Sequence, residues 1–209
     1  MSGVLYDITR PLVSGMPVWP GDAPCRVGWT GRLAADGANV AELSLSAHTG
    51  THADGPYHLL DEGPRIGAVP LDAFLGPARV VDAGGRAMLD AGWAADVLAG
   101  GAPERLLVRT GAWVDASVFP TRYAALDAEA ARLLVEAGVR LFGTDAPCVE
   151  AFDASDLPVH RVLLAGGVAV LENLLLDGVP EGAYELIALP LRLEEADSSP
   201  VRAVLRAIG

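Results

Sequence analysis

Apolar residues along the chain recur in short runs bounded by glycine, proline or aspartate. Runs of this kind, either continuously apolar or alternating with polar positions, are typical of β-strands. They predict strands over residues 4–8, 25–30, 40–46, 78–82, 105–109, 140–143, 168–171, 184–193 and 201–208. The pattern therefore favours a protein built largely from short strands.

Two segments follow a helical repeat instead. One helix is predicted over 127–137, where residues three or four apart share an apolar face: Ala130, Leu133, Leu134 and Ala137. Gly138 then supplies a stop, and a second helix is predicted over 90–98. The chain has no internal repeat, low-complexity block or long linker. We therefore expect one α/β domain over residues 1–209, with a mixed sheet and a sizeable core.

Composition narrows the function. The net charge of −12 disfavours nucleic acid as a partner. The chain contains no lysine, which excludes a lysine Schiff base, and it has neither a G-x-S-x-G elbow nor a G-x-G-x-x-G run. No apolar run is long enough to span a membrane, and the N-terminus does not look like a secretory signal. We expect a cytoplasmic protein in which Cys25 and Cys148 are free thiols.

Three of the four histidines fall within the run HTGTHADGPYH, residues 48–58. His48, His52, Asp54 and His58 occupy positions of one parity, so an extended chain would direct all four to one side. Glycine and proline argue against a regular helix through the run. It is predicted to be a strand end or tight loop that enters a short helix later. Imidazole and carboxylate ligands suit zinc or manganese, whereas the alternative is a histidine-rich surface loop.

This run resembles the HxGTHxDxPxH motif of the cyclase family of metal-dependent hydrolases, and within it the bacterial kynurenine formamidases. Every defining position matches: His48, Gly50, Thr51, His52, Asp54, Pro56 and His58. Segments 17–22, 66–72, 141–147, 184–191 and 199–205 also resemble these enzymes, so the similarity covers nearly the whole chain. The resemblance implies a swivelling β/β/α domain, and members of this kind are homodimers.

The fourth histidine, His160, and Glu172 are weak signals by themselves. His160 could be a structural histidine and Glu172 a surface charge, although a charge that follows an apolar strand needs a partner. The resemblance implies that they complete a centre of two divalent ions, most simply Zn²⁺. His48, His52 and Asp54 would bind the first ion, and Asp54 would bridge to the second. Two such ions can activate a shared water.

The resemblance leaves His58 as the general acid–base, against the alternative of a structural residue. Trp19 lies in a stiff Pro-Gly segment and would pack against an aromatic substrate, or else pack within the fold. Asp145 could orient a metal-binding side chain through a hydrogen bond, while no functional role is assigned to Asp22.

The implied reaction is hydrolysis of N-formyl-L-kynurenine to L-kynurenine and formate, in tryptophan degradation. Another amide or lactam hydrolase of the family, similar to isatin hydrolase, would share the ligands and differ in the pocket. A metal-binding protein without turnover is the alternative from another class, although binding alone does not require His58.

Overall fold

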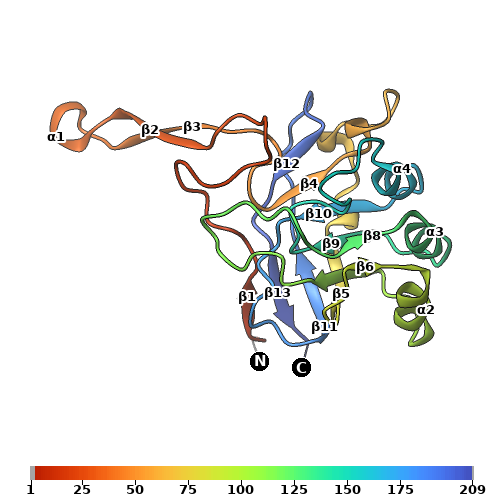
Figure 1. Ribbon diagram of the computed structural model, residues 1–209. Coiled ribbons are helices and arrows are strands. Elements are labelled where there is room, and N and C mark those ends of the chain that lie inside the picture. The colour runs from red at the N-terminus through yellow and green to blue at the C-terminus, as the bar shows by residue number, and fades with distance from the viewer. Residues whose placement is uncertain (1–2, 209) are drawn as a thin grey trace.

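The computed structural model describes residues 3–208, which form a nine-stranded mixed sheet flanked by helices (Figure 1). The strand order is β1-β13-β11-β5-β7-β9-β10-β4-β12. Its strands are β1 (Leu5–Asp7), β4 (His52–Asp54), β5 (Leu75–Asp82), β7 (Arg105–Arg109), β9 (Leu141–Thr144), β10 (Ala169–Glu172), β11 (Gly182–Ile187), β12 (Ser198–Pro200) and β13 (Val204–Ala207). The four central strands β5, β7, β9 and β10 are parallel and the outer pairings antiparallel, so the predicted mixed α/β sheet is confirmed.

Three helices lie side by side along the sheet (Figure 1): α2 (Ala91–Ala99), α3 (Ala128–Glu136) and α4 (Pro158–Ala165). Asp90 and Asp127 cap α2 and α3 by accepting hydrogen bonds from backbone N–H groups of the first turn, at 2.9 and 2.6 Å. Their apolar faces join one core cluster with β7, β9 and β10. Within residues 3–208, no helix combines the length and apolar character that crossing a bilayer would require.

A second core cluster lies among the sheet strands and includes Ile8, Phe74, Leu171, Leu186 and Leu205. The sheet curls around it, because the segment after β1 meets the segment after β10. The Leu175 N–H donates to the Ile8 carbonyl at 2.8 Å, and Thr9 pairs with Leu174 in an isolated bridge. This closure brings the residues just beyond β1 next to the end of β10.

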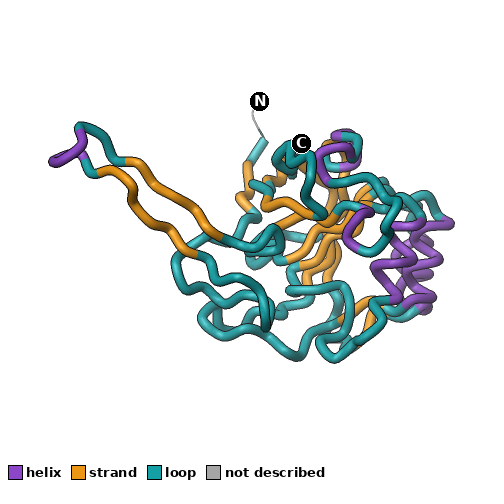
Figure 2. The backbone as a smooth tube through the Cα atoms, turned by 90° about the horizontal axis from the view of Figure 1, so that it is seen from above, coloured by secondary structure: helices purple, strands orange, loops and turns teal. Residues whose placement is uncertain are grey.

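The remaining elements are short. An arm of β2 (Arg26–Gly31), α1 (Leu33–Asp36) and β3 (Val40–Ser44) projects from the body, as Figures 1 and 2 show. Strands β6 (Met88–Leu89) and β8 (Ala125–Leu126) form a separate pair. Three 3₁₀ helices, η1 (Pro56–His58), η2 (Ile66–Ala68) and η3 (Leu71–Ala73), follow β4 and precede β5.

The predicted elements are present, with corrections at their ends. The strand predicted over 184–193 stops at Ile187. Ala188 still donates to the Phe74 carbonyl in the same register, but Pro190 has no N–H for a ladder. The segment 201–208 forms a regular strand only over Val204–Ala207. The helix over Pro158–Ala165 was not predicted. It has only eight residues, and the group that caps it comes from a different segment.

Candidate metal centre and active site

Strand β4 aligns the first ligands with the end of β10. It is buried between β10 and β12, and its register places His52 directly opposite Glu172. Because alternate residues of a strand face the same side, His52 and Asp54 project together. The His52 Nε2 atom lies 3.5 Å from Asp54 Oδ1 and 3.4 Å from Glu172 Oε2. The parity prediction is therefore confirmed for this part of the motif.

His48 reaches the same place from the turn before β4. Gly50 has φ of 66°, and a Cβ there would meet Leu12 Cδ2 at 2.7 Å, so glycine suits both the backbone and the contact. The turn brings His48 Nδ1 to 3.1 Å from Asp54 Oδ1. It also brings the Gly50 carbonyl to 2.9 Å from His52 Nδ1. A proton on Nδ1 satisfies that contact and leaves His52 Nε2 as a metal donor.

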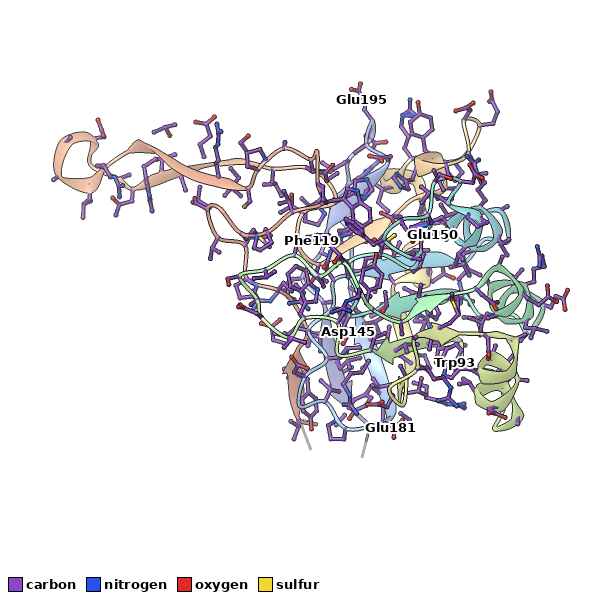
Figure 3. The ribbon with its side chains drawn as sticks, viewed as in Figure 1. Trp93, Phe119, Asp145, Glu150, Glu181 and Glu195 are labelled. Atoms are coloured by element: carbon purple, nitrogen blue, oxygen red, sulfur yellow. The ribbon has the colours of Figure 1, made fainter. Side chains whose placement is uncertain are left out.

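Helix α4 presents His160 from the other side. Glu150 accepts hydrogen bonds from the Val159 and His160 N–H groups at 2.7 and 3.0 Å, and so caps the helix. The same carboxylate lies 3.3 Å from His160 Nδ1, which orients the ring. His160 Nε2 then faces Asp54 Oδ2 at 3.6 Å and Glu172 Oε1 at 3.2 Å. Figure 3 shows Glu150 beside α4.

Three of the ligands expected from the sequence, His48, His52 and His160, thus surround the buried carboxylate of a fourth, Asp54, and Glu172 lies next to His52 and His160. Donor atoms of His48, His52 and Asp54 lie within 4.8 Å of one another, and those of Cys148, His160 and Glu172 form a second such group. A third, less buried group is formed by His48, His58 and Asp197. His52 Nε2 and both Asp54 oxygens are buried without a hydrogen-bond partner among residues 3–208. Buried polar atoms need partners. Nitrogen and oxygen donors at this spacing fit divalent cations, with Asp54 between the first two groups.

Cys148 was expected from the sequence to be a free, buried thiol, and it is both. Its sulfur lies with the His160 and Glu172 donors and accepts a hydrogen bond from the Glu150 N–H at 3.4 Å. Burial, and then the nearby Glu172 carboxylate, raise the pKa of the thiol. The second donor group therefore contains a sulfur atom that sequence reasoning did not assign.

His58 lies on η1, the short helix that follows β4, and pairs with an acid that the sequence did not single out. Its Nδ1 lies 2.9 Å from Asp197 Oδ2, and His48 Nε2 lies at the same distance from that oxygen. Asp197 directly precedes β12, whose pairing with β4 places it here. No spacing rule connects it to residues 48–58, and its position at the end of an acidic run would suggest only a surface charge.

The histidines and carboxylates of the site shift one another's pKa values. Burial alone would lower the pKa of His48, but Asp54 and Asp197 outweigh it and raise that pKa to about 10. Burial would raise the pKa of Glu172, yet the adjacent imidazoles of His160 and His52 hold it at about 2. Hydrogen bonds from His48 and His58 also hold the pKa of Asp197 well below its usual range. Among protein groups alone, the site favours carboxylates paired with protonated imidazole.

Cation binding is therefore expected to release protons, because a metal must displace the proton of His48. A raised histidine pKa adds stability that is complete below about pH 6.5 and is lost as pH rises through about 10. Protein stripped with chelator should thus become less stable from pH 7 towards pH 10, while its zinc affinity rises. Titration calorimetry in two buffers of different protonation enthalpy measures the release. Zinc binding at pH 7 with no net proton release would contradict this picture.

An aromatic wall lines the cavity next to the donors. Trp19 opens a tight turn in which the Asp22 N–H bonds the Trp19 carbonyl at 3.0 Å, with Pro20 next and Gly21 at φ 101°, as a type II turn requires. Its ring centroid lies 5.6 Å from Phe119 and 5.4 Å from Phe152. Phe119 belongs to the long loop between β7 and β8 (Figure 3).

This cavity holds about 50 Å³. It is bordered by His48, His52 and Glu172 and by a set of other residues: Arg10, Met16, Pro17, Val18, Trp19, Gly50, Trp113, Phe119, Pro147 and Asn173. Ligand pockets usually hold about 300–1,000 Å³, so an aryl substrate requires the aromatic side chains or their loop to shift.

Two acids beside the motif have other roles than ligand support. Asp145 accepts hydrogen bonds from the Thr110 N–H at 2.7 Å and the Gly111 N–H at 2.9 Å, and so fixes the start of the loop after β7. In the described part of the chain its carboxylate bonds none of the donor residues, which corrects the expectation that it supports a ligand. Asp22 closes the Trp19 turn through its backbone.

Comparison with known proteins identifies the family of this chain. The family described as putative cyclase matches residues 6–151. The chain belongs to the cyclase family. A protein of this family from Paracidovorax citrulli, named kynurenine formamidase, is 46% identical over 97% of this chain and 96% of its own. One of the same name from Salinibacter ruber is 43% identical, with 97% of each chain covered.

Two solved structures of similar fold are hydrolases by name. Isatin hydrolase A from Labrenzia aggregata has a TM-score of 0.87 at 26% identity, covering 99% of this chain and 94% of its own. A predicted metal-dependent hydrolase from Bacillus stearothermophilus has a TM-score of 0.82 at 27% identity, covering 98% of each chain. The curled mixed sheet is therefore the fold of cyclase-like hydrolases.

Proposed function

We propose that this chain is a kynurenine formamidase, which hydrolyses N-formyl-L-kynurenine to L-kynurenine and formate in tryptophan degradation. The observation that carries the proposal is identity of 43–46% with proteins of that name along nearly the entire chain. Two groups of metal donors beside an aromatic-lined cavity support it. The whole chain, residues 1–209, would serve as one catalytic domain.

In this proposal His48, His52 and Asp54 hold the first divalent cation, and His160 and Glu172, with Asp54 between, hold the second. The unpartnered His52 Nε2 and Asp54 oxygens support this assignment, and Zn²⁺ suits the donor set. Cations held there would lower the pKa of a water molecule and polarise the formyl carbonyl. The protein's part is to hold both donor groups in a fixed orientation, as Glu150 does for His160.

His58 is proposed as the acid–base. Asp197 accepts a hydrogen bond from its Nδ1, which leaves Nε2 as the atom that gains and loses a proton. Nε2 would take a proton from the attacking water and deliver it to the aniline nitrogen as the C–N bond breaks. A protonated aniline-type nitrogen leaves far more readily than its anion, so this proton is central to turnover.

The decisive experiment is hydrolysis of N-formyl-L-kynurenine by purified protein, followed through the appearance of L-kynurenine. Activity should disappear after dialysis against chelator and return when Zn²⁺ or Mn²⁺ is added back. A second sample, dialysed in the same way without chelator, controls for activity lost during dialysis itself. Full activity in protein that elemental analysis shows to be metal-free would refute the metal-dependent mechanism.

A lactam hydrolase is the second candidate, favoured by the TM-score of 0.87 with isatin hydrolase A. The two functions share the proposed ligands and differ in substrate. If the unmutated protein hydrolyses isatin far faster than N-formyl-L-kynurenine, the chain is a lactam hydrolase instead. A metal-loaded protein that hydrolyses neither compound would instead favour metal binding without turnover.

Trp19→Ala is expected to weaken use of N-formyl-L-kynurenine more than use of a small non-aromatic formamide. The indole would pack against the substrate ring, a contact worth about 0.5–1.5 kcal/mol beyond simple burial. Metal content should not change, because Trp19 is outside both donor groups. Comparing kcat/KM for the two substrates tests this. Equal losses would indicate general packing, and no loss would remove Trp19 from the binding site.

We also propose that the chain forms a homodimer through the β2–β3 arm. The arm stands clear of the body (Figure 2). It exposes four large apolar side chains, Trp29, Leu33, Val40 and Leu43. An isolated two-stranded hairpin is marginally stable in water, and exposed apolar patches mark interfaces. A second copy of the chain would cover these side chains.

Replacing Trp29 and Leu43 together by Glu should therefore convert dimers to monomers in sedimentation velocity. Leu71, an exposed apolar residue on η3, gives the matched control, and Leu71→Glu should stay dimeric. A dimer that survives the double substitution would place the interface elsewhere.

The free, buried Cys25 and Cys148 fit a reducing compartment, and we place the enzyme in the cytoplasm on that basis.

A further inference from the structure

The chain buries two arginines in very different ways. Arg105 is 1% exposed and well satisfied: Nε donates to the Ala73 carbonyl at 2.9 Å, and Nη1 donates to the Pro77 carbonyl and the Glu104 carboxylate at 3.1 Å each. Arg10 is 8% exposed and poorly satisfied. Its Nη2 makes two long contacts, at 3.5 and 3.4 Å, and Nε has no partner among residues 3–208.

Arg10 also lacks a charged partner. Across the described residues, no carboxylate comes within ion-pair distance of its guanidinium. Burial lowers the pKa of Arg10 to about 10, which leaves it protonated at neutral pH. A buried charge is costly unless it is paired and hydrogen-bonded. Since Arg105 shows that this fold can satisfy a buried arginine completely, the open donors of Arg10 suggest a partner from outside the chain.

The place of Arg10 identifies that partner. It borders the cavity that His48, His52 and Trp19 also line. Its guanidinium lies over the Trp113 ring, 4.2 Å from the centroid, which holds its plane. Its backbone N–H donates to Thr51 Oγ1 at 2.9 Å, which ties it to the turn of the histidine motif. A rigid, buried cation beside the reaction centre is suited to an anion of the substrate.

We propose that Arg10 binds a carboxylate of the substrate and so selects aryl formamides that carry one. On the proposed function, on which this inference rests, the group is the α-carboxylate of N-formyl-L-kynurenine. Its oxygens would accept hydrogen bonds from the open guanidinium donors, chiefly Nε. Binding would pair the charge, hold the amino-acid end of the substrate, and leave the formamide at the metal donors. Arg10 is a binding residue for a group remote from the bond that breaks.

The test compares two substrates in Arg10→Gln. One is N-formyl-L-kynurenine, and the other is 2′-formamidoacetophenone, the same aryl ketone without the amino-acid group. KM for the first should rise about 10–150-fold, the equivalent of the roughly 1.5–3 kcal/mol of a hydrogen bond to a charged group. Kinetic constants for the second should change little. Arg10→Lys, which keeps the charge, should recover part of the loss for the first substrate alone.

Arg132→Gln is the matched control, because Arg132 is exposed, pairs with Glu129 on helix α3 and does not border the cavity. It should leave both substrates unaffected. Metal content and thermal unfolding of each variant separate binding from folding. Equal losses for both substrates in folded, metal-loaded Arg10→Gln, or no loss for either, would overturn the proposal.

Direct binding keeps this inference separate from the proposed function. Calorimetry on the unmutated protein should show L-kynurenine binding more tightly than 2-aminoacetophenone, and Arg10→Gln should remove the difference. If the unmutated protein hydrolyses neither formamide but shows this preference, the formamidase proposal fails while the carboxylate site stands. Equal binding of the two products to the unmutated protein would refute the carboxylate site.

Discussion

Asp54→Asn is expected to lose metal from both donor groups and nearly all hydrolysis. Asp54 is 1% exposed, and its two oxygens face different histidines: Oδ1 lies 3.1 Å from His48 Nδ1, and Oδ2 lies 3.6 Å from His160 Nε2. The amide keeps the volume but removes the negative charge and one acceptor. Outer groups that merely orient ligands are worth about 10–100-fold, so loss of a shared ligand should exceed that range.

Elemental analysis and kcat at saturating zinc measure both effects. Asp22→Asn is the matched control, since it removes one acid near the cavity while the Trp19 turn keeps its backbone bond. It should retain metal and activity. Thermal unfolding checks that Asp54→Asn still folds. A variant that loads two cations per chain would show that Asp54 is not the shared ligand.

His58→Ala should keep its metal and lose about 10²–10⁴-fold in kcat, the usual contribution of a positioned proton-transfer group. His58 belongs to neither of the two donor groups proposed to hold the cations, and its Nδ1 bonds Asp197, although His48, His58 and Asp197 form a further group of close donors. Stripping of metal from a folded His58→Ala protein would show that this histidine is a ligand. With a substrate whose leaving group needs no proton, the difference in kcat between His58→Ala and the unmutated protein should become smaller.

Asp197→Asn tests the positioning of His58 by its neighbour. The amide can no longer stabilise an imidazolium, so kcat should fall by less than in His58→Ala and its pH profile should shift. The fall should be absent in a protein that already carries His58→Ala, because Asp197 acts through that ring. If the double variant instead has a lower kcat than either single variant, Asp197 has a role independent of His58. Such a role could act through His48, whose Nε2 lies 2.9 Å from Asp197 Oδ2.

Part of the candidate site could be predicted from the chain because three of the proposed ligands are close in sequence. Residues 48–58 combine a turn, the strand β4 and the helix η1, so local geometry already gathers His48, His52 and Asp54. The residue types themselves indicate a divalent metal. The strands over 105–109 and 168–171 and the helix over 127–137 were predicted because their apolar periodicity is strong.

Other parts depend on contacts between distant segments, which no local pattern records. Glu150 orients His160 from eight residues before the helix begins, and Asp197 reaches His58 only because β12 pairs with β4. Arg10 meets the cavity because the sheet curls and joins the residues after β1 to those after β10. Phe119 and Phe152 complete the wall around Trp19 from separate loops.

By itself, then, the sequence predicted the α/β class and, within residues 48–58, a divalent-metal site, since these follow from short-range spacing and side-chain type, whereas His160 and Glu172 were expected only from the family resemblance. Only the tertiary structure decided which acids orient the histidines, where the aromatic wall stands and which arginine is left without a partner. Those relations arise from strand register and sheet closure, which join residues more than a hundred positions apart.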